Sequence, residues 1–265
     1  MYAFDYRRPS TLNEADLALK AMPGAKLLAG GQTLIPTLKQ RLNRLPGLID
    51  LGAITGLDGI SRKDGALVIG AMATHYAVAN SAEVKAAIPQ LANLAGNIGD
   101  PQVRNRGTIG GSLANNDPAA DYPAAGLALG ASFKTNKRTL TAEQFFKGLF
   151  ETALDENEIL TEIHFPVAKR FGYAKFANPA SRYALVGVAV AETTSGVRVA
   201  VTGAGADGVF RVPAMEAALA KSFAPNAVSG IAVDPKMLGS DMHAAADYRA
   251  HLIGVLAARA VTLAG

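Results

Sequence analysis

The stretch NRGTIGGSLANND, residues 105–117, places two adjacent glycines between an isoleucine and a serine, and residues typical of turns follow at once. A second pair, Gly30-Gly31, lies far upstream in LLAGGQTLIPTL, residues 27–38. Glycine has no Cβ, so it lets a ligand or another backbone approach closely. Consecutive backbone N–H groups in a tight turn bind anions, and a helix that begins there adds its positive end. The two pairs indicate either ordinary turns or two parts of a phosphate-binding cradle.

The residues around the first pair are expected to alternate between strand and helix. Thr11 and Glu14 have the spacing of a capping box, which predicts a helix over 11–22. Short buried strands are expected at 25–29 and 47–51. A short helix is expected after the glycines, because three leucines recur at every fourth residue, namely Leu34, Leu38 and Leu42.

The residues around the second pair read differently. A hairpin is expected around Lys63-Asp64-Gly65, and a helix over 75–97 that Pro89 interrupts. Glycine, asparagine, aspartate and proline crowd residues 99–123, which predicts a long irregular segment of the kind that often carries function. A strand is expected to end at Pro166.

Beyond about residue 170 the pattern indicates a separate α+β unit. Two strands are expected on either side of a turn at Ser195-Gly196, followed by amphipathic helices over 213–223 and 243–264. The stretch GAGADG at 203–208 matches the spacing of a dinucleotide-binding loop. No helix follows it, however, so we expect an ordinary loop there.

The composition excludes several classes of protein. An apolar fraction of 49% with 18% charged residues is typical of a globular chain, and no apolar run is long enough for a membrane span. The first twenty residues carry charges throughout and lack the apolar core of a secretory signal, so we expect a cytoplasmic protein. The net charge of +4 comes from scattered basic residues without interleaved aromatics, which argues against nucleic-acid binding.

The chain has no cysteine, which excludes disulfides, thiolate-bound iron–sulfur clusters and a cysteine nucleophile within it. The four histidines lack metal-ligand spacing, so we expect structural roles for them and no metal site. Neither a P-loop nor a G-x-S-x-G elbow is present.

Five motifs in order resemble the FAD-binding medium subunits of the molybdenum hydroxylases, particularly the carbon monoxide dehydrogenase type. They are AGGQTLIPTLKQRL…LIDL, IGAMATH, DPQVRNRGTIGGSLANNDPAADYPA, ASRYALVGVAVA and SDMHAAADYRAHLIGVLAARA. The resemblance extends over essentially the whole chain. It implies an α+β fold in which two FAD-binding subdomains of the vanillyl-alcohol-oxidase type, residues 1–53 and 54–170, clasp FAD. A C-terminal α+β domain, residues 171–265, with three strands and helices closes against the flavin.

The resemblance also implies cofactor-binding residues. Two segments would wrap the diphosphate and ribityl part of FAD, which makes the two glycine pairs halves of one phosphate cradle. The residues of these segments are Leu28, Ala29, Gly30, Gly31, Gln32, Thr33 and Leu34, together with Thr108, Ile109, Gly110, Gly111 and Ser112.

Four further positions match family residues near the cofactor, and each has a plainer alternative. Asp121 would accept hydrogen bonds from cofactor hydroxyls, or would cap the helix that follows it. Leu160 would pack near the ring system, or belong to the ordinary core. Lys175 would place a cation near the reduced flavin, or be an exposed strand lysine. Tyr183 would lie near the isoalloxazine, or be a buried tyrosine of the hairpin.

The resemblance implies an electron-transfer subunit of an oxidoreductase, with no catalytic residue for substrate chemistry on this chain. A large molybdenum-cofactor subunit and a small subunit with two [2Fe–2S] clusters would be its partners, in a heterohexamer built as a dimer of heterotrimers. FAD would pass electrons to an external acceptor. The open alternatives are a self-contained FAD oxidase and a non-catalytic flavin-binding protein.

The chain departs from the family pattern at two places. Gln32-Thr33 stands where many relatives have His-Ser, so no proton-transfer role is assigned there. The acidic residues that xanthine-dehydrogenase-like members carry near the position of Arg182-Tyr183 are missing, which argues against NAD as the acceptor without identifying another.

Overall fold

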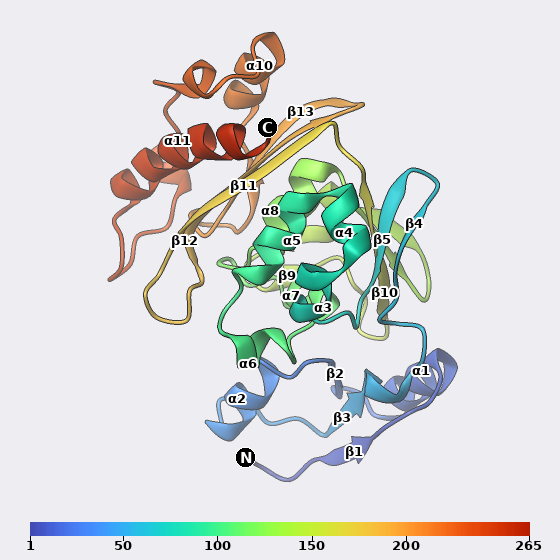
Figure 1. Ribbon diagram of the computed structural model, residues 1–265. Coiled ribbons are helices and arrows are strands. Elements are labelled where there is room, and N and C mark those ends of the chain that lie inside the picture. Colours follow the sequence, from blue (N-terminus) through green and yellow to red (C-terminus); the bar gives the residue numbers. More distant parts are fainter.

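The computed structural model describes residues 1–265 and contains three larger β-sheets, with helices packed between and around them (Figure 1). The N-terminal residues lie at the lower end of the view in Figure 1, and the last helices lie at the upper end. The α+β class expected from the sequence is confirmed. No helix combines the length and the apolar character that a membrane crossing requires.

The first sheet is parallel and small, with strand order β1-β3-β2. Its strands are β1 (Asp5–Arg7), β2 (Lys26–Leu28) and β3 (Gly47–Asp50), connected by helices α1 (Leu12–Ala21) and α2 (Leu34–Lys39). The side chain of Thr11 caps α1 as expected, while Glu14 accepts hydrogen bonds from Ser10. Strand β3 is buried, but β2 lies at the sheet edge and is half exposed, so of the buried strand expected over 25–29 only Ala25 is buried.

The second sheet has five antiparallel strands in the order β4-β5-β10-β6-β7. The hairpin expected around Lys63-Asp64-Gly65 is confirmed as the turn between β4 and β5. The strands are β4 (Ile60–Lys63), β5 (Ala66–Gly70), β6 (Ser132–Thr135), β7 (Thr139–Thr141) and β10 (Leu160–Pro166). Helix α9 (Ala142–Phe145) and the short hairpin β8 (Phe146–Gly148) and β9 (Glu151–Thr152) follow β7.

Residues 75–129 are mostly helical, and here the structure corrects two expectations. The helix expected over 75–97 is three short helices, because Ser81 caps a new helix and Pro89 begins another. The irregular segment expected over 99–123 contains two capped helices, because Asp100 and Thr108 each accept a hydrogen bond from a backbone N–H one turn later. The helices are α3 (His75–Asn80), α4 (Ala82–Ala87), α5 (Pro89–Gly96), α6 (Pro101–Arg104), α7 (Ile109–Asn115) and α8 (Tyr122–Leu129).

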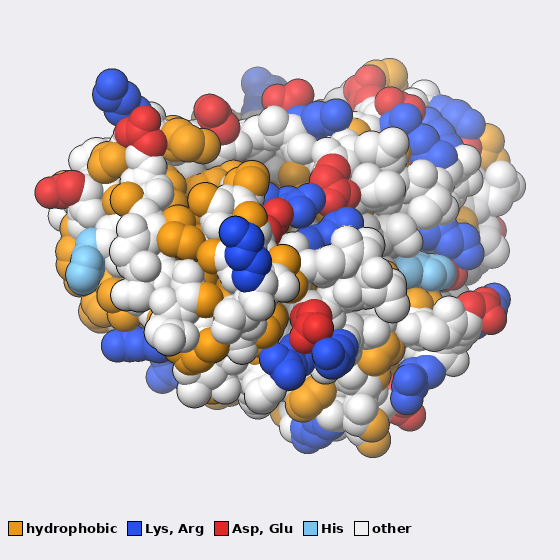
Figure 2. Space-filling view, turned by 90° about the horizontal axis from the view of Figure 1, so that it is seen from above, with side chains coloured by type: hydrophobic (Ala, Val, Ile, Leu, Met, Phe, Trp, Pro, Cys, Tyr) orange, Lys and Arg blue, Asp and Glu red, His pale blue; other side chains and the backbone are white.

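The C-terminal sheet lies between α8 and two helices at the end of the chain. Its antiparallel order is β11-β12-β13-β14, from β11 (Arg170–Ala177), β12 (Ala184–Thr193), β13 (Gly196–Thr202) and the two-residue β14 (Phe210–Arg211). Successive residues of β12 face opposite sides, so Ala189 and Ala191 join the central core while its valines pack with α10 (Pro213–Lys221) and α11 (Ala246–Leu263). Figure 2 looks onto this end, where hydrophobic side chains lie among scattered charged ones.

Helix α8 is buried on all sides, which is typical of a helix in the centre of a domain. The largest core cluster contains its residues together with residues of the second sheet and of the C-terminal sheet. The second and C-terminal sheets therefore share one core around α8.

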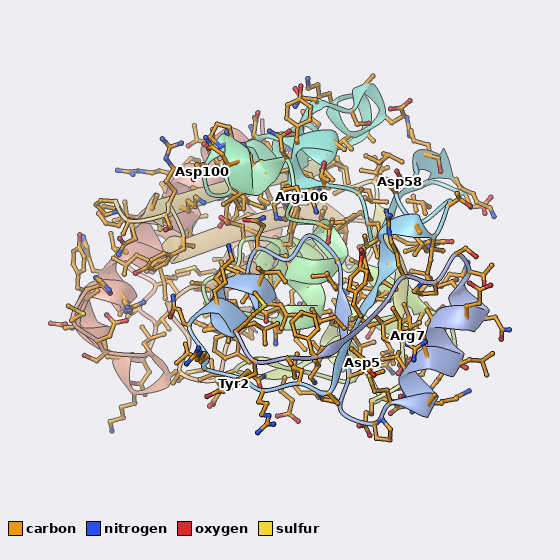
Figure 3. All side chains as sticks on the ribbon, turned by 90° about the horizontal axis from the view of Figure 1, so that it is seen from below. Tyr2, Asp5, Arg7, Asp58, Asp100 and Arg106 are labelled. Carbon is orange, nitrogen blue, oxygen red and sulfur yellow. The ribbon has the colours of Figure 1, made fainter.

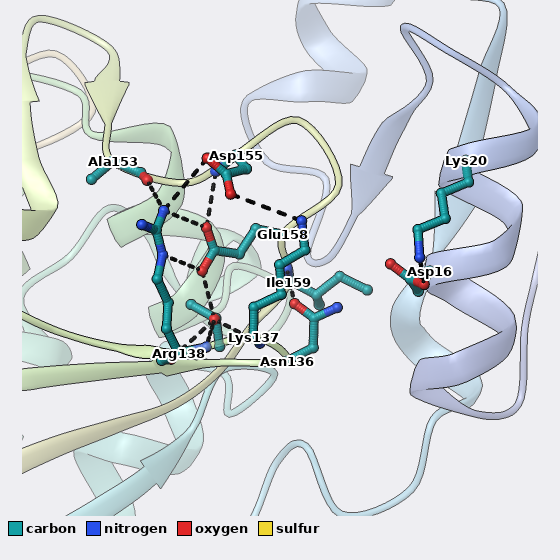
Figure 4. Close-up of polar contacts among 10 residues, drawn as sticks. Asp16, Lys20, Asn136, Lys137, Arg138, Ala153, Asp155, Glu158 and Ile159 are labelled. Atoms are coloured by element: carbon teal, nitrogen blue, oxygen red, sulfur yellow. Dashed lines mark hydrogen bonds and ion pairs between the residues drawn. The ribbon is translucent and has the colours of Figure 1, made fainter.

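A buried carboxylate fixes the start of β10 (Figure 4). The side chain of Glu158 is fully buried and accepts hydrogen bonds from the Arg138 guanidinium at 2.8 and 3.0 Å and from the Thr135 hydroxyl at 2.7 Å. Burial alone would raise the pKa of Glu158, but these bonds and one from the Asp155 backbone lower it to about 2. Nearby, Asn136 and Ile159 exchange hydrogen bonds just before Leu160.

Candidate functional site

The two glycine-bearing segments meet where the loop after β2 packs against the loop before α7. A Cβ added to Gly30 would overlap the carbonyl oxygen of Arg106 and lie 2.7 Å from the Cα of Gly107. One added to Gly111 would lie 3.5 Å from the Cβ of Ala29. We call this contact between residues 29–34 and 106–111 the glycine junction. Figure 3 views the molecule from below and labels Arg106 of this junction, with Tyr2 lower in the view.

The first segment of the glycine junction offers a run of free hydrogen-bond donors. The backbone N–H groups of residues 30–34 donate to no protein group. Gly31 has φ of +73°, a left-handed conformation of the kind found in anion-binding backbone turns. Residues 30–34 are partly or fully exposed, so an anion from solvent can reach them.

The second segment has a different role from the one expected. Gly110 and Gly111 lie in the first turn of α7 rather than in a tight bend at a strand end. The N–H groups of Ile109 and Gly110 donate to Ala73 and Ala71, at 3.0 and 2.9 Å, and that of Gly111 donates to the Thr108 hydroxyl at 3.1 Å, so none is free. The second pair therefore permits close packing, since a Cβ on Gly110 would lie 2.5 Å from that of Ala71.

The second segment contributes one free hydroxyl group, that of Ser112. Ser112 makes no side-chain hydrogen bond within the chain, and its residue is half exposed. The structure thus brings the two expected segments together, with free N–H groups from one and a free hydroxyl from the other.

A buried ionic network lies between α8 and the C-terminal sheet. Asp121 accepts a hydrogen bond from the Tyr173 hydroxyl at 2.6 Å and pairs with the Lys175 ammonium at 2.9 Å. Asp121 makes no side-chain cap for α8, so the capping alternative is wrong. The Lys175 side chain is only 8% exposed, so the alternative of an exposed strand lysine is wrong as well.

Lys175 uses all three of its N–H donors. Besides Asp121, its ammonium donates to the carbonyl oxygen of Asn97 at 2.9 Å and to that of Arg182 at 2.8 Å. It therefore ties the end of α5 and the β11–β12 turn to the buried carboxylate.

The protonation of this network follows from its burial. Burial raises the pKa of Asp121, and the Lys175 charge and the Tyr173 hydrogen bond oppose that rise. Burial and the neighbouring Asp121 raise the pKa of Tyr173 well above its ordinary value, so its phenol stays protonated and donates. Tyr173 was missed from the sequence, although residues two apart on a strand, such as Tyr173 and Lys175, share a face.

The remaining two candidate residues are Leu160 and Tyr183, and neither makes a hydrogen bond to the Asp121 carboxylate. Leu160 is buried in the central core at the first position of β10. Tyr183 lies at the end of the β11–β12 turn and is half-buried, and its hydroxyl accepts a hydrogen bond from Asn178 at 2.8 Å. The preceding Ser181 and Arg182 both have left-handed φ angles, of +61° and +59°.

His75 and Tyr122 are buried polar residues near the glycine junction that the sequence did not single out. His75 Nδ1 and the Tyr122 hydroxyl are buried without a hydrogen-bond partner, and their ring centroids are 5.5 Å apart. A Cβ on Gly107 would lie 2.7 Å from His75 Nε2. Burial and the Arg104 charge lower the pKa of His75 to about 4, so its imidazole is neutral at pH 7.

Comparison with known proteins identifies the family to which this chain belongs. Residues 2–168 match the family model described as the FAD binding domain in molybdopterin dehydrogenase. The carbon monoxide dehydrogenase medium chain of Hydrogenophaga pseudoflava is 36% identical over 98% of this chain and 96% of its own length. This chain belongs to the molybdopterin dehydrogenase FAD-binding family. The resemblance inferred from the motifs is confirmed.

Two further family members cover the full length. The nicotine 6-hydroxylase medium subunit of Paenarthrobacter nicotinovorans is 35% identical over 99% of this chain and 98% of its own. The solved carbon monoxide dehydrogenase from Oligotropha carboxidovorans has a chain that superposes with a TM-score of 0.92 at 32% identity, covering 99% and 98% of the two chains. The family fold therefore includes the C-terminal sheet, and the chain is an oxidoreductase subunit with FAD as its cofactor.

The residues of the glycine junction fit the chemistry of FAD. A diphosphate needs several convergent donors and a backbone that it can approach closely. Residues 30–34 supply the free N–H groups, and the glycines at 30 and 31 have no side chain to block the approach.

Proposed function

We propose that this medium subunit carries FAD at the glycine junction and passes electrons from a partner subunit to an external acceptor. FAD, when bound, accepts electrons singly and delivers them onward singly or in pairs. The observation that carries the proposal is the run of free N–H groups at residues 30–34, packed against the backbone of 106–107. In this assignment these groups bind the diphosphate.

The proposed binding set keeps the residues that the family motifs indicate. Its members are Leu28, Ala29, Gly30, Gly31, Gln32, Thr33 and Leu34, Thr108, Ile109, Gly110, Gly111 and Ser112, and Asp121, Leu160, Lys175 and Tyr183. Their roles differ: the first segment binds through N–H groups, Ser112 through its hydroxyl, and Gly110 by allowing close packing.

The Asp121–Lys175 pair acts as an orienting element in this proposal. The two charges lie 2.9 Å apart, so the pair presents little net charge to a neighbouring ring. Lys175 also holds the turn that carries Tyr183, through its bond to the Arg182 carbonyl. The network therefore positions the turn and the C-terminal sheet relative to α8, and its dipole orients the cofactor.

The partners in the proposal follow from what this chain lacks and from its relatives. It has no cysteine, so [2Fe–2S] clusters require another subunit, and its relatives are named as medium chains of larger enzymes. We assign the clusters to a small subunit, the molybdenum cofactor to a large one, and the assembly to a dimer of heterotrimers. The proposed units of this chain are residues 1–53, 54–170 and 171–265.

Two measurements test the proposal. The purified chain should develop the visible spectrum of bound flavin after FAD addition, and the chain isolated from its host should bring large and small subunits with it. A lone yellow protein that oxidises alcohols would instead indicate a self-contained oxidase. A yellow protein without partners or turnover would indicate a flavin-binding protein.

A further inference from the structure

An exposed patch on residues 1–53, which we call the N-terminal lobe, has a composition that the FAD site does not explain. Its residues, which we call the N-lobe patch, are Met1, Tyr2, Arg41, Leu42 and Arg44. Leu42 is 73% exposed, and Met1 and Tyr2 are 46% and 44% exposed. Leu42 is one of three leucines that the sequence places on a helix face, yet α2 ends before it. Single exposed apolar residues are common, but Met1 and Leu42 are chain neighbours of Tyr2 and Arg41, whose side chains contact each other.

The two arginines flank one aromatic ring. The guanidinium carbons of Arg41 and Arg44 each lie 5.6 Å from the centroid of the Tyr2 ring, within the range of a cation–π interaction. Neither arginine has a carboxylate partner within the chain. Residues 26–49, which include both arginines, contain four basic residues and no acidic one.

The backbone holds this patch rigidly and under strain. The N–H of Leu42 donates to Thr37 and that of Arg41 donates to Leu38, both at 3.1 Å, which is the Schellman pattern at the end of α2. The left-handed residue in this motif is usually glycine, but here it is Arg41, with φ of +60°. Strain of this kind persists where the surrounding structure holds it in place, and it clusters at binding and active sites.

We infer that the N-lobe patch docks a subunit of the same complex whose contact surface carries carboxylates around an apolar centre. Tyrosine and arginine dominate the energetics of protein interfaces, and exposed Leu42 and Met1 supply apolar area beside them. A guanidinium stacked on a ring leaves its N–H edge free for a bidentate carboxylate. The inference rests on the proposed function, because it requires that the chain have partner subunits.

The test compares two double variants of the FAD-loaded chain. Arg41→Glu/Arg44→Glu should weaken binding to the co-purified large and small subunits by ~10-fold or more and should flatten its salt dependence. Arg62→Glu/Lys63→Glu changes the charge equally at the exposed β4–β5 turn, where no ion pair forms, and should leave the affinity within about twofold. Equal losses in the two variants, or no loss in the first, would overturn the inference.

A second variant separates docking from folding. Arg41→Gly relieves the left-handed strain and removes one charge. The isolated chain should unfold at the same or a higher temperature, while its affinity for the subunits falls. A lower unfolding temperature together with unchanged affinity would make Arg41 structural and overturn the inference.

Two further outcomes would assign the patch differently. In the first, the wild-type chain binds vesicles containing phosphatidylserine and Arg41→Glu/Arg44→Glu does not, while both bind the subunits equally well. The partner is then a membrane and the inference is wrong. If the wild-type chain takes up FAD but captures no subunit, the proposed function and the inference fail together. Subunit capture that is insensitive to the variants refutes only the inference.

Discussion

At the scale of single residues, Gly30 is a point of tight backbone contact between the two segments proposed to bind FAD. A Cβ there would overlap the Arg106 carbonyl, and backbone cannot move aside as a side-chain end can. We expect Gly30→Ala to lower FAD affinity at least ~10-fold and to destabilise the chain by about 1–3 kcal/mol. Fluorescence titration with FAD and urea unfolding measure the two effects. Gly59→Ala is the control, since no atom lies within 4 Å of its added Cβ.

Lys175 and Asp121 are coupled, and a double-mutant cycle measures how strongly. Lys175→Met leaves the Asp121 carboxylate buried without its counter-charge, which destabilises a protein by about 3–5 kcal/mol. Adding Asp121→Asn removes the stranded charge, so the double variant should regain much of that stability. Urea unfolding of the four proteins gives the coupling energy. Additive effects would mean that the two side chains do not interact as the 2.9 Å distance indicates.

His75 makes stability depend on pH in the mildly acidic range. Its pKa is about 4 in the folded chain and about 6.5 when unfolded, so the unfolded state binds more protons between these values. Stability is therefore full above about pH 6.5 and falls as the pH drops toward 4, by up to about 3 kcal/mol. His75→Asn should flatten this part of the profile of unfolding free energy against pH. An unchanged slope would show that His75 gains its proton as readily in the folded chain.

At the scale of elements, local signals decided what could be predicted. The hairpins at Lys63-Asp64-Gly65 and Ser195-Gly196 and the Thr11-capped helix depend on residues close in sequence, and all are present. The helices of residues 99–123 were missed because composition outweighed the capping positions of Asp100 and Thr108. The network of Asp121 joins residues some fifty positions apart, and no local pattern reports such a pairing.

The Glu158–Arg138 contact is an element-scale connection, because it ties the β6–β7 turn to the segment before β10. The pKa of Glu158 is about 2 in the folded chain, below its ordinary value. The contribution of its carboxylate to folding stability is therefore full above about pH 4.5. It is lost as the pH falls from there toward 2, and amounts to up to about 3 kcal/mol. Glu158→Gln should remove this loss of stability at low pH and keep the loss that His75 causes at mildly acidic pH. Unfolding at pH 3 to 6 separates the two windows.

At the scale of the whole molecule, the buried apolar residues are divided unequally. The central core joins 32 buried residues from the second sheet, the helices between α3 and α9, and one face of the C-terminal sheet. The two clusters around the first sheet contain six and three buried residues. One residue of the larger cluster, Ile159, comes from the segment just before β10. The N-terminal lobe therefore depends on contacts with its neighbours more than the rest of the chain does.

This division predicts where FAD stabilises the molecule. Residues 1–53 hold the free N–H groups but little core of their own, so we expect the amides of β1, β3 and α1 to exchange with solvent faster than those of the other two large sheets. Saturating FAD should slow exchange there at least ~10-fold, because a ligand that binds only the closed arrangement shifts the opening equilibrium. Amides of α8 and β12 should change much less. Hydrogen–deuterium exchange with and without FAD, repeated on Gly30→Ala, tests this prediction. Uniform slowing of exchange over all three sheets would show that FAD does not stabilise the N-terminal lobe selectively.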